Sequence, residues 1–114
     1  MNTQHASLAE GRWHALSLAE QLANIGSEVH RARIAQEKGL ESRFHSAADR
    51  ALELFDLTLA DLRWKAQKRL FELGRMRAVL ADAFLGGEEY GATLDGLEPY
   101  FDRFALLAAQ KVGL

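Results

Sequence analysis

Residues 17–39 read SLAEQLANIGSEVHRARIAQEKG, and this stretch decides the fold. Its apolar residues recur in steps of three and four, which places them along one side of an α-helix. They are Leu18, Leu22, Ile25, Val29 and Ala32. Ser17 followed by Glu20 is a capping-box pattern, and Gly39 supplies the left-handed conformation that ends many helices. We therefore predict a helix that begins at Ser17 and ends near Lys38.

Two further features qualify this first helix. Ser7 with Glu10 is a second capping-box pattern, so the helix has an alternative, earlier start. Small residues also run beside the leucine stripe, namely Ala15, Ala19, Ala23 and Gly26. A neighbouring backbone can approach closely along such a row, and we interpret it as tight helix packing.

A second helix is expected from Glu41 to about Ala60. One side carries an apolar series at helical spacing: Phe44, Ala48, Ala51, Phe55 and Leu62. Leu54 and Leu57 point nearly the opposite way. A helix with so wide an apolar arc must be covered on two sides, by two neighbours in its own chain or by another subunit. We expect it to be the central helix.

Continuous helix from Glu41 to Leu85 would be about 67 Å long, too long for a compact domain of this size. We therefore place a break between Asp61 and Trp64, with Asp61 capping a third helix that ends at Leu85. An acidic, Gly-rich loop follows over residues 86–96, and a last helix begins near Pro99, a favourable first-turn residue. The fold class predicted is all-α, a mostly antiparallel, up-down four-helix bundle.

The composition fits one globular domain over residues 1–114, of which we expect residues 1–8 to be flexible. The 114 residues are 48% hydrophobic and 26% charged, with no cysteine and a net charge of −2. Thiol chemistry, zinc–thiolate sites and disulfides are therefore excluded. No stretch approaches the roughly 18 apolar residues of a membrane span, and the first ten residues do not form a signal peptide. We expect a cytoplasmic protein that does not enter membranes.

Motifs of catalysis are absent from the sequence. It contains no Gly-rich phosphate loop, nucleophile elbow, His-Glu-x-x-His or paired Glu-x-x-His motif. The best metal-like set projects from one side of the second helix: His45, Asp49, Glu53 and Asp56. One helix rarely supplies more than two ligands to one ion, so we interpret this set as a solvated acidic surface. We predict no enzyme, no cofactor and no metal site.

Arg77 is unusual because it falls within the apolar stripe of the third helix. Leu73 precedes it by one turn and Leu80 follows it by one turn. A buried guanidinium requires a carboxylate or several carbonyls as partners. We favour a buried structural ion pair, and the alternative is that Arg77 reaches an interface.

Charge is unevenly distributed along the chain. Residues 63–77 contain six basic residues against the single acid Glu72, whereas residues 82–102 contain six acids and no base. The candidate contact for nucleic acid or a partner is Arg63, Trp64, Lys65, Lys68, Arg69 and Arg75, because basic residues with a nearby aromatic ring suit a phosphate backbone. An equally good interpretation is that the acidic segment neutralises this basic one, within one chain or between subunits.

Three stretches carry a family resemblance: Trp13 to Val29, Arg50 to Thr58, and Gly86 to Gly91. Over about Trp13 to Phe104 the chain resembles a family of small bacterial all-helical proteins without assigned activity. In size and helix layout it is more loosely similar to the four-helix-bundle accessory proteins of diversity-generating retroelement reverse transcriptases. That resemblance implies a ring-forming oligomer that holds a reverse transcriptase and its RNA, although those proteins are basic and this chain is not.

The function predicted is a non-enzymatic helical interaction module that self-associates and scaffolds a protein or nucleoprotein partner. The alternative is an accessory nucleic-acid-binding protein of the reverse-transcriptase type, which would use the basic face of the third helix. We expect a homo-oligomer on two grounds: the wide apolar arc of the second helix and the opposite charges of the third helix and the acidic segment.

Overall fold

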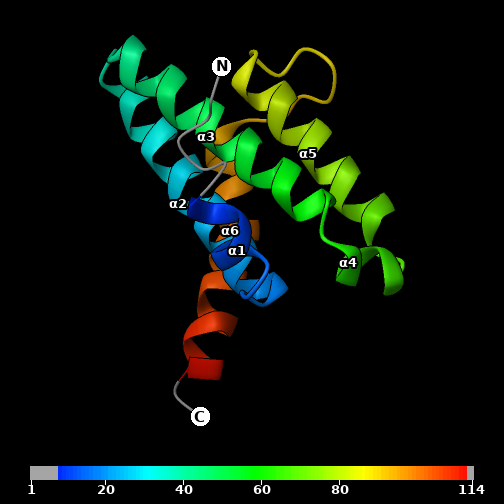
Figure 1. Cartoon of the computed structure of the whole chain (residues 1–114). Helices are drawn as coiled ribbons and strands as arrows, with labels where there is room; N and C mark the ends of the chain where they lie inside the picture. Colours follow the sequence, from blue (N-terminus) through cyan, green and yellow to red (C-terminus); the bar gives the residue numbers. More distant parts are fainter. Residues whose placement is uncertain (1–7, 113–114) are drawn as a thin grey trace.

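The computed structural model describes residues 8–112, which fold into six α-helices without a strand (Figure 1). Their bounds are α1 Leu8–Trp13, α2 Leu18–Glu37, α3 Glu41–Leu59, α4 Leu62–Ala66, α5 Leu70–Phe84 and α6 Leu94–Val112. The all-α class is confirmed. The segment expected to be flexible lies outside the described residues except for Leu8, which begins α1. None of the described helices is long and apolar enough to cross a membrane.

Helices α2 and α3 form an antiparallel hairpin whose ends were predicted correctly. Both halves of the capping box are present, because Ser17 Oγ accepts the Glu20 N–H at 3.1 Å and Glu20 Oε1 accepts the Ser17 N–H at 2.8 Å. Gly39, at φ +69°, adopts the left-handed conformation in the turn between the helices. The local chain chemistry is therefore enough to set these two helices.

The core forms where α3 is covered from several sides. On α2 the predicted stripe is buried at Leu22, Ile25 and Val29, and on α3 both Phe55 and Leu54 are buried although they point different ways. Helix α3 contacts α1, α2, α4 and α5. Its wide apolar arc is thus covered by neighbours in the same chain, and this feature alone does not call for a second subunit.

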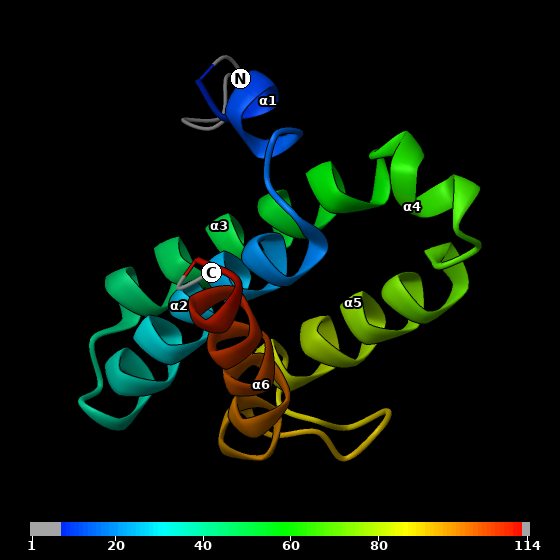
Figure 2. The ribbon, with the colours of Figure 1, turned by 90° about the horizontal axis from the view of Figure 1, so that it is seen from below.

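Helix α6 crosses α2 at close range (Figure 2). A Cβ atom placed on Gly26 would lie 2.6 Å from Phe101 Cβ, so only glycine allows this approach. The prediction of close packing along the small-residue row is confirmed at this position. The C-terminal end of α6 extends past the other helices (Figure 1).

The predicted third helix is divided into two pieces. The break at Asp61 is confirmed, since its side chain accepts the Arg63 N–H at 3.1 Å and caps α4. However, α4 lasts five residues, and α5 begins only at Leu70. Between them Lys68 takes a left-handed conformation, φ 60°, which ends one helix before the next begins.

The last helix begins five residues before Pro99, so the predicted start is wrong. Thr93 Oγ1 accepts the Gly96 N–H at 3.0 Å and supplies the N-terminal cap. Pro99 lies inside α6, where it lacks the N–H that would bond to the carbonyl of Asp95. Thr93 therefore marks the start of α6, and Pro99 does not.

Candidate functional site

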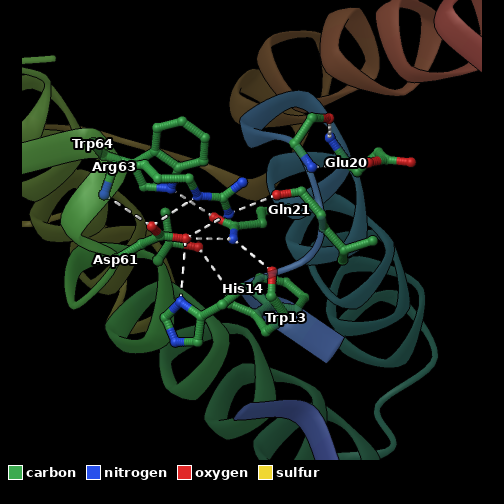
Figure 3. Close-up of polar contacts among 10 residues, drawn as sticks. Trp13, His14, Glu20, Gln21, Asp61, Arg63 and Trp64 are labelled. Carbon is green, nitrogen blue, oxygen red and sulfur yellow. Dashed lines mark hydrogen bonds and ion pairs between the residues drawn. The ribbon is translucent and has the colours of Figure 1, made fainter. Parts of the chain in front are cut away.

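A buried polar network joins the start of α2 to the turn between α3 and α4 (Figure 3). Gln21, 0% exposed, is at its centre and donates from Nε2 to the Trp13 carbonyl at 2.8 Å and to Asp61 Oδ2 at 3.1 Å. Its Oε1 accepts the indole N–H of Trp64 at 2.9 Å. The other indole, that of Trp13, donates to Thr58 Oγ1 at 3.0 Å. Both tryptophan rings therefore fill the core while their N–H groups are satisfied.

Asp61 is the charged member of the network and is 3% exposed. Arg63 donates from Nε to Oδ1 at 3.0 Å and from Nη2 to Oδ2 at 2.7 Å, and His14 Nδ1 lies 3.2 Å from Oδ2. The Arg63 guanidinium holds the pKa of Asp61 far below its usual range. Burial acts in the opposite direction, and the Arg63 N–H, Gln21 and His14 add to the lowering. The carboxylate is therefore charged at neutral pH and paired on both oxygens.

Arg63 extends the network to the chain segment before α2. Its Nη2 donates to the Leu16 carbonyl at 2.7 Å, and its Cζ lies 4.4 Å from the centroid of the Trp64 ring. A planar guanidinium can pair with a carboxylate and stack on an indole at the same time. These contacts tie the segment between α1 and α2 to α4.

The hydrogen bonds and ion pairs of this network join residues of separate helices. His14 beside Asp61 has the imidazole–carboxylate geometry of a catalytic base and its orienting acid. Ser17 Oγ accepts the Glu20 N–H at the start of α2, and Thr58 Oγ1 accepts the Trp13 indole N–H. We interpret the network as a clamp between α2 and the α3–α4 turn.

The structure divides the six residues predicted to contact nucleic acid or a partner. Arg63 and Trp64 belong to the clamp, and Trp64 is buried. The other four lie on α4, on the turn after it and on α5: Lys65, Lys68, Arg69 and Arg75. Arg69 is partly buried, and its Nε has no hydrogen-bond partner among residues 8–112. The basic residues thus do not form the single helical face that was expected.

Arg77 forms an ion pair between α5 and α3. Its Nε donates to Asp56 Oδ1 at 2.7 Å and its Nη2 to Oδ2 at 3.3 Å. The two side chains are 32% and 59% exposed, which corrects the expectation of a buried guanidinium. Because Arg77 lies at the edge of the buried side of α5, its long side chain reaches solvent beside α3.

The four residues of the acidic surface predicted on α3 differ in their contacts and exposure. His45 packs its ring edge-on against Phe44, with centroids 5.3 Å apart, and Asp56 holds Arg77. Asp49 is exposed and Glu53 partly exposed. In the part of the chain that the structure describes, no three potential ligands gather at one metal position.

The outer face of α5 is a surface that the sequence pattern did not single out. We define it as Phe71, Gly74, Arg75, Ala78 and the C-cap residue Leu85, which share one side of the helix by their spacing. Phe71 is 82% and Leu85 84% exposed, whereas Leu80 on the opposite side is fully buried. The sequence does contain a signal for this surface, because Phe71 and Leu85 are large apolar residues outside the core stripe of the predicted third helix.

Asp82 fastens the Gly-rich loop to this same side of α5, one turn after Ala78. Its Oδ1 accepts the Glu89 N–H at 2.8 Å and its Oδ2 the Tyr90 N–H at 3.0 Å. Burial opposes ionisation of Asp82, but hydrogen bonds from the loop amides outweigh it, so the pKa is lowered. The loop therefore places Glu88 and Glu89 at the C-terminal end of the outer face. In the sequence, Asp82 is recognised only as one of the six acidic residues between positions 82 and 102.

Comparisons with known proteins return no relative: no family model matches the chain, and no curated protein or solved structure matches it. The resemblance to the small bacterial helical family therefore rests on the quoted residues alone, and the looser one to the retroelement accessory proteins rests on size and helix layout.

Proposed function

We propose that the protein is a non-enzymatic, cytoplasmic interaction module that self-associates through the outer face of α5 and scaffolds a protein or nucleoprotein partner. In this proposal α2, α3, α5 and α6 act as a four-helix bundle, and α1 and α4 brace it. The observation that carries the proposal is the exposure of Phe71 and Leu85, at 82% and 84%, on one side of a single helix. Large apolar side chains grouped in this way are typical of protein interfaces.

The spacing on α5 suits an antiparallel pair of identical helices. Phe71 stands seven residues before Ala78 and Leu85 seven residues after it. A two-fold axis passing through Ala78 would bring Phe71 of one protomer against the partner's Leu85, twice. Gly74 and Ala78 lie between them and are small enough to let two helices approach closely.

Charges at the two ends of α5 favour the same arrangement. Lys68 and Arg75 are exposed near its N-terminal end, and Glu88 and Glu89 are exposed near its C-terminal end. Antiparallel pairing places the basic end of one helix beside the acidic end of the other. Opposite charges arranged in this way set orientation and suppress other pairings.

The decisive measurement is the solution mass as a function of protein concentration. We expect the wild type to reach twice the 12.7 kDa protomer mass at micromolar concentration. Phe71→Ser should weaken the dimer at least tenfold while changing the free energy of unfolding of the protomer by less than about 0.5 kcal/mol. Leu106→Ser, at a 61% exposed position on α6, is the matched control and should leave the dimer intact. A wild-type monomer at 100 µM would refute self-association.

Orientation is tested by exchanging charges. Lys68→Glu should weaken the dimer because it places an acid beside the partner's acidic loop. Adding Glu88→Lys to the same chain should restore the attraction and recover most of the affinity. A double variant weaker than Lys68→Glu alone would contradict the antiparallel arrangement.

A second candidate, nucleic-acid binding, is favoured by the exposure of Lys65, Lys68 and Arg75, none of which has an ion-pair partner among the described residues. Phosphate contacts release counterions and make binding steeply salt-dependent. Titration of a fluorescent single-stranded RNA at several salt concentrations tests it. Binding that falls steeply with salt and is lost in Lys65→Gln/Lys68→Gln supports this function, and no binding at 50 mM salt refutes it.

A further inference from the structure

A pocket of about 500 Å³ lies between α2 and α3, close to the turn that joins them. Four cationic side chains line it, and none of the lining residues is acidic: the cations are Arg31, Lys38, Arg43 and Arg50. Ser42 and Ser46 add two hydroxyls, and Ile34 and Ala47 add an apolar wall. No residue of α5 takes part, so this surface is separate from the proposed interface.

Glu28 fixes two of the four cations from behind. It is buried, 8% exposed, and its Oε2 accepts from Arg31 Nη1 at 2.9 Å while its Oε1 accepts from Arg50 Nε at 3.2 Å. One carboxylate thus orients two guanidinium groups that come from different helices. Since each group uses only part of its donor fork, N–H groups remain for a ligand.

The other two cations have no such partner. Lys38 and Arg43 are exposed, and no carboxylate of residues 8–112 lies within ion-pair distance of either. Even counting Glu28, the pocket has an excess of three positive charges. Like charges gathered in a concavity repel one another and focus a positive potential there, which attracts an anion.

We propose that this pocket binds a small phosphate ester with an apolar or aromatic body, in the size class of a mononucleotide. Phosphate is the anion that suits the site, because planar guanidinium forks pair with it bidentately and hydroxyls complete its hydrogen bonds. Ile34, Leu40 and Ala47 supply the surface against which the organic part would lie. The volume falls in the usual range of small-molecule pockets, roughly 300–1,000 Å³.

Calorimetric titration at 150 mM salt tests the proposal, with adenosine triphosphate and pyrophosphate as the two probes. We expect saturable binding of the nucleotide, with pyrophosphate at least tenfold weaker because it lacks the organic body. Arg43→Gln and Lys38→Gln should each weaken nucleotide binding about tenfold. Both residues are exposed, and circular dichroism checks that each variant keeps its fold.

The matched controls are Arg12→Gln and Arg103→Gln, which remove the same charge at exposed positions outside the pocket. They should change nucleotide affinity less than twofold. The proposal is overturned if neither probe binds at 1 mM, if pyrophosphate binds as tightly as the nucleotide, or if the controls weaken binding as much as the pocket variants. It is also overturned if Arg43→Gln weakens the binding of a single-stranded RNA while the free nucleotide does not bind.

Discussion

The clamp between α2 and the α3–α4 turn and the outer face of α5 both contain aromatic and cationic side chains. Among the described residues, these side chains are bonded within the chain in the clamp and exposed without such bonds on α5. In the clamp, Trp13 and Trp64 are 5% exposed and Arg63 is paired with Asp61. On the outer face of α5, Phe71 is 82% exposed and Arg75 has no carboxylate partner among the described residues. Aromatic and cationic residues therefore stabilise the protomer in one region and remain available to a second molecule in the other.

The difference lies in how hydrogen-bonding capacity is used. Both the oxygen and the nitrogen of the Gln21 amide form hydrogen bonds within the chain, so its removal leaves the buried indole N–H of Trp64 without a partner. Removing Phe71 uncovers almost nothing, since its ring already faces solvent. Substitutions in the two regions should accordingly change different quantities: the free energy of unfolding in the clamp, and association at α5.

The largest effect is expected for Gln21→Leu. It strands the Trp64 indole N–H, removes one of the two N–H groups that the Trp13 carbonyl accepts and removes one donor to Asp61, so we expect a loss of about 3 kcal/mol in the free energy of unfolding. Urea denaturation measures it. Asn24→Leu, on the exposed side of the same helix, is the control and should change stability by less than about 0.5 kcal/mol. A loss below 1 kcal/mol for Gln21→Leu would mean that the clamp is not a stabilising unit.

A change of intermediate size in the free energy of unfolding is expected when the pH is lowered. Because the folded pKa of Asp61 lies below the unfolded value of about 3.9, its contribution is present above that pH and is lost as the pH falls towards the folded pKa. We expect Asp61→Asn to be less stable than wild type by about 2 kcal/mol at pH 7, with the difference shrinking below pH 4. Denaturation from pH 2 to pH 7 measures it, with Asp49→Asn as the exposed control. A constant difference across this range would contradict the assignment.

The smallest effect is expected at Arg77, which lies at the edge of the buried side of α5 and pairs with Asp56 of α3. Its pair with Asp56 is largely exposed, so Arg77→Met should lower the free energy of unfolding by less than about 1 kcal/mol. A double-mutant cycle with Asp56→Asn should give a coupling of roughly 0.5 kcal/mol. A loss near 3 kcal/mol would indicate a guanidinium that is buried after all.

The hairpin was predictable because its determinants are local. The cap at Ser17, the turn at Gly39 and the stripe of α2 each lie within a few residues of the structure that they set. The division of the third helix was not predictable, since Lys68 carries no signal for the left-handed conformation that glycine usually provides. Local patterns therefore recovered the helices better than their interruptions.

The clamp escaped sequence analysis for a different reason. Several of its side-chain bonds join residues far apart in the sequence, such as Gln21 to Asp61, 40 positions apart, and Trp13 to Thr58, 45 positions apart. No periodicity links such residues, and each has an ordinary local role. Asp61 was identified as a cap, which is correct, but its burial and its pairing with Gln21 depend on how α2 and α3 pack.

The contact between Gly26 and Phe101 has a consequence for how the chain folds as it is made. The two residues are 75 positions apart, so at typical bacterial and eukaryotic synthesis rates of 5–20 residues per second Phe101 follows Gly26 by about 4 to 15 s. The α2–α3 hairpin can form during that interval, but the side of α2 that receives α6 stays uncovered. The nascent chain therefore exposes for seconds the side of α2 that later receives Phe101, and a chaperone that shields it would act before α6 arrives.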